Sequence, residues 1–194
     1  MNIGIMGGTF NPIHNAHCEF VKRFILQYQL DICYVIPAHI SPFKIDQEII
    51  SDIHRLNLVK IALLDYPHVI VSDIEIQRQG ISYTIDTINQ IKSIHPNSSL
   101  FLLIGEDQAR DFDKWREYKA IIDSANLVVI KRFEKNYQNI SYPHLNDAKL
   151  YYLDAPMYSI SSTEIREKVK NHQSISGEVP SNVEDYIYKH SLYL

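Results

Sequence analysis

The stretch Gly7-Gly8-Thr9-Phe10-Asn11-Pro12-Ile13-His14-Asn15-Ala16-His17 follows directly on the short apolar run Ile3–Met6 and leads into a helical pattern. A strand, a glycine turn and a helix in this order are typical of a nucleotide-phosphate site. The glycines let a ligand approach the backbone without a Cβ atom in the way, and Pro12 fixes a turn. We expect the helix to offer unpaired N–H groups to an anion. His14 and His17 should share one helical face and donate hydrogen bonds to the same phosphate chain.

Short apolar, β-branched runs alternate with amphipathic helical patterns along the chain. This alternation is typical of βαβ units, so it predicts an α/β fold with a doubly wound, mostly parallel sheet. In such folds ligands bind beyond the carboxyl ends of the strands, near the point where the strand order reverses. The expected strands are Ile3–Met6, Ile32–Ile36, Val69–Ser72, Leu100–Ile104, Leu127–Ile130 and Leu150–Leu153.

The length of 194 residues favours one domain over residues 1–194, with a small helical part near residues 160–194. The stretch Phe133–Lys149, rich in Asn, Tyr and Pro, is interpreted as a long surface connection. The expected helices are His17–Gln29, Glu48–Leu64, Thr84–His95, Trp115–Asp123, Thr163–Asn171 and Ser181–His190.

Composition and charge favour a cytoplasmic protein that binds small molecules. The formal net charge is −4 and no long basic run occurs, so we expect no nucleic-acid partner. Cys18 and Cys33 lack metal-type or CxxC spacing, which fits a reduced cytosolic chain. The glycine turn begins too early for a signal peptide, and no apolar stretch approaches the ~20 residues needed to span a bilayer. We therefore expect neither export nor a membrane.

A second phosphate-type element, Ile160-Ser161-Ser162-Thr163-Glu164-Ile165-Arg166, stands near the other end of the chain. Ser161 and Glu164 have the spacing of a capping box at a helix start. The hydroxyls, amides and Arg166 of this element suit anionic oxygens. Alone, this element would be weak evidence for a phosphate site, because Ser-x-x-Glu with a later Arg begins many ordinary helices. Its value comes from its occurrence together with the first motif.

Together the two segments resemble the nucleotidyltransferases with the (H/T)xGH signature. The likeness is greatest to the bacterial nicotinate-nucleotide adenylyltransferases, in which GGTFDPIHxGH is paired with a late ISSTxIR, and it extends over nearly the whole chain. The resemblance implies a Rossmann-like nucleotidyltransferase fold and a role in NAD biosynthesis. It implies that ATP and nicotinate mononucleotide react to give nicotinate adenine dinucleotide and pyrophosphate. No covalent intermediate is expected, because the 5′-phosphate of the acceptor attacks the α-phosphorus in line.

The resemblance also assigns roles to residues of this chain. The implied catalytic residues are His14 and His17, which would hydrogen-bond the triphosphate, and Arg166, which would hold the β- and γ-phosphates. Thr84, Trp115 and Tyr83 would bind nicotinate mononucleotide, with Trp115 stacking on the pyridine ring. Mg²⁺ would arrive with ATP, bridging phosphates and waters. The residues expected to bind ATP are Gly7, Gly8, Thr9, Phe10, Lys44, Gly105, Asp107, Ser161, Ser162 and Thr163.

Each of these residues has a plainer interpretation. The spacing of His14 and His17 could suit two metal ligands, but zinc needs three or four and the segment does not complete the set. Lys44 would ordinarily be a solvated loop lysine, and Trp115 a core aromatic. Gly105-Glu106-Asp107 could be a simple turn, and Ser82-Tyr83-Thr84 a simple helix cap.

Four positions depart from the family pattern. Asn11 replaces the commoner Asp, and Ala16 replaces the Gly of HxGH. We expect neither change to affect the reaction. Phe43 stands where a His often precedes the basic residue, and Arg116 stands where an aromatic residue can follow Trp115. The last two bear on recognition of the acceptor rather than on the use of ATP.

Other functions stay open at this point. The same chemistry could act on nicotinamide mononucleotide or phosphopantetheine, although the Thr84 and Trp115 contexts favour nicotinate. A non-catalytic nucleotide sensor would not need His14, His17 and Arg166 as a phosphate clamp. An RNA-modifying relative would need an RNA-binding surface that this acidic chain does not display. The sequence leaves the oligomeric state, including a homo-oligomer, open.

Overall fold

A parallel sheet forms the centre of the molecule in the computed structural model, which describes residues 1–43, 49–130, 142–156 and 158–194. The strands are β1 (Asn2–Gly8), β2 (Ile32–Pro37), β3 (Val69–Val71), β4 (Ser99–Gly105), β5 (Asn126–Ile130) and β6 (Leu150–Leu153). They lie in the order β3-β2-β1-β4-β5-β6, and every neighbouring pair is parallel. The predicted doubly wound α/β fold is therefore confirmed.

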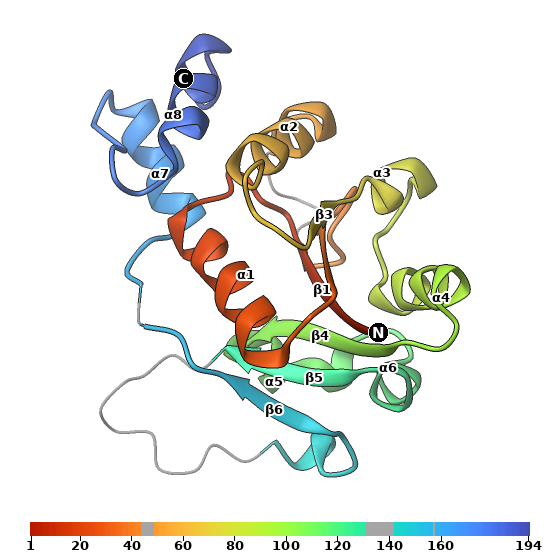
Figure 1. Ribbon diagram of the computed structural model, residues 1–194. Coiled ribbons are helices and arrows are strands. Elements are labelled where there is room, and N and C mark those ends of the chain that lie inside the picture. The colour runs from red at the N-terminus through yellow and green to blue at the C-terminus, as the bar shows by residue number, and fades with distance from the viewer. Residues whose placement is uncertain (44–48, 131–141, 157) are drawn as a thin grey trace.

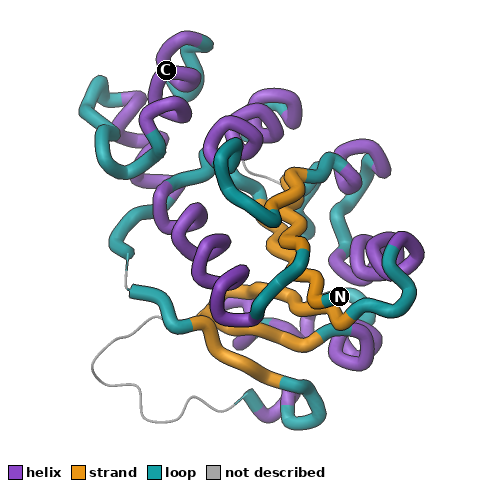
Figure 2. Tube along the Cα trace, viewed as in Figure 1, coloured by secondary structure: helices purple, strands orange, loops and turns teal. Residues whose placement is uncertain are grey.

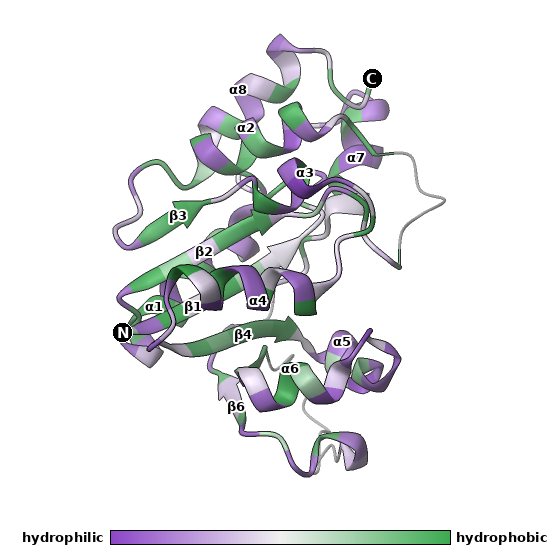
Figure 3. Ribbon diagram, turned by 90° about the vertical axis from the view of Figure 1, so that its right-hand side faces the viewer, coloured by the Kyte–Doolittle hydropathy of each residue, from purple (hydrophilic) through white to green (hydrophobic). Residues whose placement is uncertain are grey.

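The strands are apolar along their length because both faces of the sheet are covered (Figure 2). Successive side chains of a strand point to opposite faces, so Ile5 and Met6 of β1 belong to different core clusters. On β2 the same alternation separates Val35 from Ile36. Figure 3 shows β2 and β4 as mostly hydrophobic strands between helices of mixed character.

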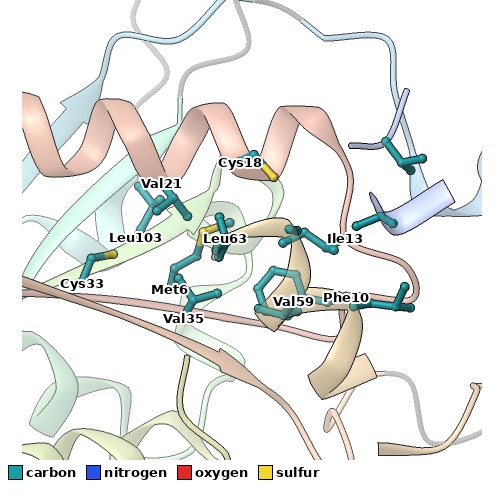
Figure 4. Close-up of a cluster of buried hydrophobic side chains, with 14 of the residues drawn as sticks. Met6, Phe10, Ile13, Cys18, Val21, Cys33, Val35, Val59, Leu63 and Leu103 are labelled. Carbon is teal, nitrogen blue, oxygen red and sulfur yellow. The ribbon is translucent and has the colours of Figure 1, made fainter. Parts of the chain in front are cut away.

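Different helices cover the two faces of the sheet (Figure 1). One face packs against α1 (Asn15–Tyr28) and α2 (Asp52–Ala62), and the cluster continues to α7 (Ser162–Lys170) and α8 (Ser181–Lys189). Figure 4 shows part of this cluster, with Cys18 and Val21 of α1 above Met6 and Leu103 of the sheet. The other face packs against α3 (Ile74–Arg78), α4 (Thr84–Ile94), α5 (Glu106–Arg110) and α6 (Tyr118–Ser124). None of the described helices combines the length and apolarity needed to cross a membrane.

The observed elements differ from the predicted ones mainly where they are short. The five-residue helices α3 and α5 lie where we expected only loops, because one turn and a half carries no readable periodicity. Helix α6 starts at Tyr118 rather than Trp115, because Glu117 has a left-handed backbone with φ of 52°. Single 3₁₀ turns occupy Phe112–Lys114 and Pro143–Leu145.

The strand order reverses between β1 and β4, whose carboxyl ends therefore lie side by side. Gly7 and Gly8 are the last two residues of β1, so the predicted glycine turn is in fact the end of a strand. A Cβ atom on Gly8 would lie 2.9 Å from the ring of Phe10. A larger residue at position 8 would thus displace Phe10, which itself has a left-handed backbone with φ of 47°.

Candidate active site

A cavity of about 870 Å³ opens where the strand order reverses, beyond the carboxyl ends of β1 and β4. Its size is at the upper end of what small-molecule sites occupy. His14 and Ser161 are not among the described residues that line it, and Lys44 lies outside the described residues. The predicted site residues that do line it are Gly7, Gly8, Thr9, Phe10, His17, Tyr83, Thr84, Gly105, Asp107, Trp115, Ser162, Thr163 and Arg166.

The segment after β1, Thr9–Pro12, is here called the phosphate loop. Its backbone carbonyl groups are bonded to side chains from distant elements. The carbonyl of Thr9 accepts a hydrogen bond from Arg55 at 2.8 Å, and that of Asn11 accepts one from Arg166 at 2.9 Å. The Pro12 carbonyl accepts one from the hydroxyl of Ser162 at 2.8 Å. These carbonyl oxygens are thereby occupied by donors, which lessens their repulsion of an anion.

The side chain of Asn11 is also held, although it stands where the family has Asp. The hydroxyl of Tyr193 donates a hydrogen bond to Asn11 Oδ1 at 3.0 Å. Burial raises the pKa of Tyr193, while the nearby charges of Arg166 and Arg55 act in the opposite direction. The hydroxyl therefore stays protonated and remains a donor at neutral pH. A neutral amide at position 11 accepts this bond without adding negative charge to the loop.

The two histidines of the first motif lie together but in unlike positions. Their rings stack with centroids 3.7 Å apart, yet His14 is buried and caps α1, whereas His17 lines the cavity. The backbone N–H of His14 donates to Nδ1 of His17 at 3.3 Å. In the neutral ring this acceptor role leaves the proton of His17 on Nε2. Burial lowers the pKa of His14 to about 4, so that ring is neutral at physiological pH.

The start of α1 differs from the prediction in one respect. The backbone N–H of Asn15 donates to the carbonyl of Glu178 at 2.9 Å, and that of His14 is used by His17. The expectation that the helix start offers unpaired N–H groups is therefore wrong for these two amides. The physical reason is that the segment before α8 packs onto the helix end and takes up one donor.

The second motif forms the start of α7, as the capping-box spacing predicts. The hydroxyl of Ser161 accepts a hydrogen bond from the backbone N–H of Glu164 at 3.1 Å. Ser161 is thus occupied by the helix cap. Ser162, Thr163 and Arg166 follow it on the cavity wall. Arg166 donates to Thr163 Oγ1 at 3.4 Å, so hydroxyl and guanidinium groups share this side of the cavity.

Aromatic side chains gather at the opposite side of the cavity, where nicotinate mononucleotide is expected. The Trp115 ring stacks on Phe112 with centroids 4.8 Å apart and also lines the cavity, so it packs against the core and its role in binding the ligand stays a prediction. The Arg116 guanidinium lies 4.7 Å from the centre of the Tyr83 ring. It also approaches Asp86 at 3.7 Å. The guanidinium therefore lies beside the aromatic groups, but it is shared with the carboxylates of Asp86 and Glu117.

The turn after β4 was expected either to be a simple turn or to contact the ligand. Gly105 caps α5, and its backbone N–H donates to Gln108 Oε1 at 2.8 Å. Asp107 is exposed and lines the cavity. A Cβ atom on Gly105 would lie 2.5 Å from Asp107 Oδ1, so glycine at this position leaves room for the carboxylate.

Sequence reasoning missed several groups in and around the cavity. Glu75 lines it although its side chain is buried, and it accepts a hydrogen bond from Thr87 at 2.6 Å. Burial raises the pKa of Glu75, while hydrogen bonds from Thr87 and Ser82 and the charge of Arg78 partly offset the rise. Arg55 lies behind the phosphate loop and is 1% exposed. No sequence signal marks either residue, since each looks like the polar face of an amphipathic segment.

Ionic groups of both signs surround the cavity. Lys114 lines it and pairs with Asp111 at 2.5 Å, and that partner raises the pKa of Lys114. Within the described part of the chain, no three His, Cys, Asp or Glu side chains gather as a metal site. The donors on the phosphate side are hydroxyl, imidazole and guanidinium groups, which suit phosphate oxygens rather than a cation.

Comparison with known proteins identifies relatives of this chain. The cytidylyltransferase-like family matches residues 5–168. The probable nicotinate-nucleotide adenylyltransferase of Dictyoglomus thermophilum is 40% identical, with 100% of each chain covered. That of Borreliella burgdorferi is 34% identical, with 100% of this chain and 97% of the relative covered.

Solved structures show the same fold. The Plasmodium falciparum nicotinic acid mononucleotide adenylyltransferase complexed with NaAD superposes with a TM-score of 0.82 at 24% identity, covering 99% of this chain and 97% of the other. The same enzyme complexed with APC gives a TM-score of 0.79 at 23% identity, with 99% and 96% covered. At these identities the likeness concerns the fold, whereas the full-length relatives establish the family. The chain is thus a member of the cytidylyltransferase-like family and, within it, belongs to the nicotinate-nucleotide adenylyltransferases.

Proposed function

We propose that the protein transfers the adenylyl group of ATP to nicotinate mononucleotide, giving nicotinate adenine dinucleotide and pyrophosphate for NAD biosynthesis. The observation that carries this proposal is a single cavity with two unlike sides at the strand reversal. One side presents His17, Arg166 and the hydroxyls of α7, and the other presents Tyr83 and Trp115. The first side suits a triphosphate and the second an aromatic ring.

The reaction needs positioning rather than a nucleophilic side chain. An oxygen of the acceptor's 5′-phosphate forms a bond to the α-phosphorus while the bond from that phosphorus to the β-phosphate oxygen breaks. In our proposal Nε2–H of His17 donates to the triphosphate where negative charge develops. Arg166, Ser162 and Thr163 hold the departing β- and γ-phosphates, and buried His14 supports the ring of His17.

Magnesium enters this scheme as part of the substrate. The donors on the phosphate side suit phosphate oxygens, so the ion would take its ligands from the phosphates and water. It would neutralise part of the triphosphate charge. We further propose a cytoplasmic location, which agrees with the two unpaired buried cysteines.

The acceptor end of the cavity supports nicotinate over nicotinamide. Arg116 brings a positive charge to the Tyr83 ring, and a carboxylate gains more from such a charge than a neutral amide does. The same side of the cavity offers Thr84 at the first turn of α4, where backbone N–H groups favour an anion.

The test is to incubate the protein with magnesium-ATP and each of nicotinate mononucleotide, nicotinamide mononucleotide and phosphopantetheine. Pyrophosphate release gives the rate, and chromatography identifies the product. Preferential formation of nicotinate adenine dinucleotide supports the proposal. Preference for another acceptor would keep adenylyl transfer but contradict the acceptor assignment. ATP binding without turnover would favour a nucleotide sensor.

A further inference from the structure

Arg55 of α2 is a buried charge directly behind the phosphate loop. Its side chain is 1% exposed, and burying a guanidinium is costly unless its N–H groups are paired. It donates to the Thr9 carbonyl at 2.8 Å and to the His39 carbonyl at 3.3 Å, and it forms an ion pair with Asp52. One planar group therefore joins the phosphate loop to the segment that follows β2.

This contact to the phosphate loop differs from those made by α7. Arg166 and Ser162 bond the loop and also line the cavity, so substrate phosphates compete for them. Arg55 is not among the described residues that line the cavity. Its bond to Thr9 can therefore persist when ligands bind, and it opposes rotation of the peptide that precedes Phe10. The left-handed backbone of Phe10 persists only where the surroundings determine it.

The hydrogen bonds continue from Arg55 to the acceptor side of the cavity. The backbone N–H of His39 donates to Ser82 Oγ at 2.9 Å, and the backbone N–H of Ser82 donates to the Ile40 carbonyl at 2.8 Å. Ser82 directly precedes Tyr83, which lines the cavity. The guanidinium thus lies between the phosphate loop and the segment expected to hold the mononucleotide. Asp52, which also hydrogen-bonds the His39 ring, fixes the orientation of the guanidinium.

We propose that Arg55 is a positioning residue that sets the distance and orientation between the phosphate loop and the Ser82–Thr84 segment. This inference rests on the proposed function, since alignment of two bound substrates is what it explains. A small misalignment of the attacking phosphate slows the chemical step more than it weakens either ground-state complex. Loss of the bridge should therefore lower kcat and leave the two KM values nearly unchanged.

The decisive variant is Arg55→Lys, which keeps the charge beside Asp52 but cannot bond both carbonyl groups as a planar fork does. We expect kcat to fall about 10- to 100-fold, with the KM values for ATP and nicotinate mononucleotide changing less than about threefold. Arg23→Lys is the matched control. Arg23 also pairs with a carboxylate, Glu19, and donates to a carbonyl, that of Asp154, but it is partly exposed and is not among the described residues that line the cavity. Its kcat should equal that of the wild type.

A second variant tests the bond between His39 and Ser82. It also keeps the inference testable if Arg55→Lys does not fold. Ser82→Ala removes the acceptor of the His39 N–H and should lower kcat about fivefold or more. Ser82→Ala also removes the hydrogen bond to Glu75. If Arg55→Lys folds, the loss of kcat in the double variant should therefore be smaller than the product of the two single losses, because both changes break the connection through His39.

The results separate this inference from the proposed function. Arg55→Lys that is folded by circular dichroism and has wild-type kcat would overturn the inference, and so would a loss confined to melting temperature or to KM. If that variant is unfolded, wild-type kcat for Ser82→Ala would overturn it. A wild-type protein that transfers no adenylyl group to any acceptor would contradict the proposed function, and the inference with it.

Discussion

The phosphate side and the acceptor side of the cavity are built differently. The phosphate loop is held by side chains from α2, α7 and the C-terminal turn, and Phe10 in the loop and Arg55 behind it are almost fully buried. On the acceptor side, Arg116 is half exposed, and Phe43, which lies 6.2 Å from the Trp115 ring, is 56% exposed.

This difference suits the phosphate side to catalysis and the acceptor side to the choice of substrate. A buried, cross-connected loop keeps its donors in place at no reorganisation cost, which transition-state stabilisation requires. Half-exposed side chains on short turns tolerate substitution, because they have few packing partners to disturb. We therefore expect changes on the phosphate side to affect turnover or stability strongly, and changes on the acceptor side to affect affinity and selectivity modestly.

The largest effect is expected for His17→Asn. Asn can still accept the hydrogen bond from the backbone N–H of His14, but it lacks the Nε2–H that we propose donates to the triphosphate. Removing one such donor typically lowers kcat about 100- to 1000-fold. Steady-state kinetics would measure the loss, and urea unfolding should show little change in stability. His172→Asn, at an exposed turn after α7, is the control and should keep full activity. Equal activity in both variants would exclude His17 from catalysis.

The second effect concerns stability in acid. The folded protein lowers the pKa of His14 from 6.5 to about 4, so between these pH values the unfolded chain binds the proton more readily. The part of the free energy of unfolding that depends on a neutral His14 is fully present above pH 6.5 and is lost as the pH falls toward 4. At pH 5 the loss should be about 2 kcal/mol. His14→Asn keeps a side chain suited to capping α1 and should not show this loss. Urea unfolding at pH 7.5 and pH 5 measures it, and parallel curves for both proteins would contradict the assignment.

A smaller effect is expected for Trp115→Ala on the acceptor side. Loss of an aromatic stacking surface should raise KM for nicotinate mononucleotide about tenfold, while KM for ATP and kcat change little. Trp115→Phe should restore most of the affinity, because a flat ring remains on Phe112. A rise in KM for ATP instead would mean that Trp115 lies at the wrong end of the cavity for its proposed role.

The smallest effect is expected for Arg116→Gln. The guanidinium is half exposed and shared with Asp86 and Glu117, so its interaction with a carboxylate is screened. The ratio of kcat/KM for nicotinate over nicotinamide mononucleotide should fall about two- to fivefold. Asp86→Asn should shift the ratio the other way, since it removes a competing negative charge. An unchanged ratio in both variants would show that this charge takes no part in selectivity.

Regular features of the fold could be predicted from the sequence. Short, mainly apolar runs identified all the strands found in the described residues, and their alternation with helical patterns gave the parallel sheet. The carboxyl ends of parallel strands meet at one edge, so the residues after Ile3–Met6 and Leu100–Ile104 were expected to share a crevice. The cavity is lined by both segments.

Features that depend on tertiary contacts could not be predicted in this way. His14 and His17 are three residues apart, yet only the packing around α1 shows that one is buried and the other lines the cavity. Arg55 has the sequence context of a helix-surface residue, and its burial depends on carbonyl groups at positions 9 and 39. Local periodicity contains no information about such partners. The expected role of Lys44 stays a prediction.

The hydrogen bonds that hold the phosphate loop also determine when the site can form during synthesis of the protein. Ser162 bonds a residue 150 positions earlier in the chain, Arg166 one 155 positions earlier, and Tyr193 one 182 positions earlier. A ribosome adds about 5 to 20 residues per second, so the loop leaves the exit tunnel several seconds before these partners have been made. The nucleotide site is therefore complete only after Tyr193 has left the ribosome. A chain stalled or truncated before these residues would lack the contacts that hold the phosphate loop, and also the side chains that α7 and α8 add to the core.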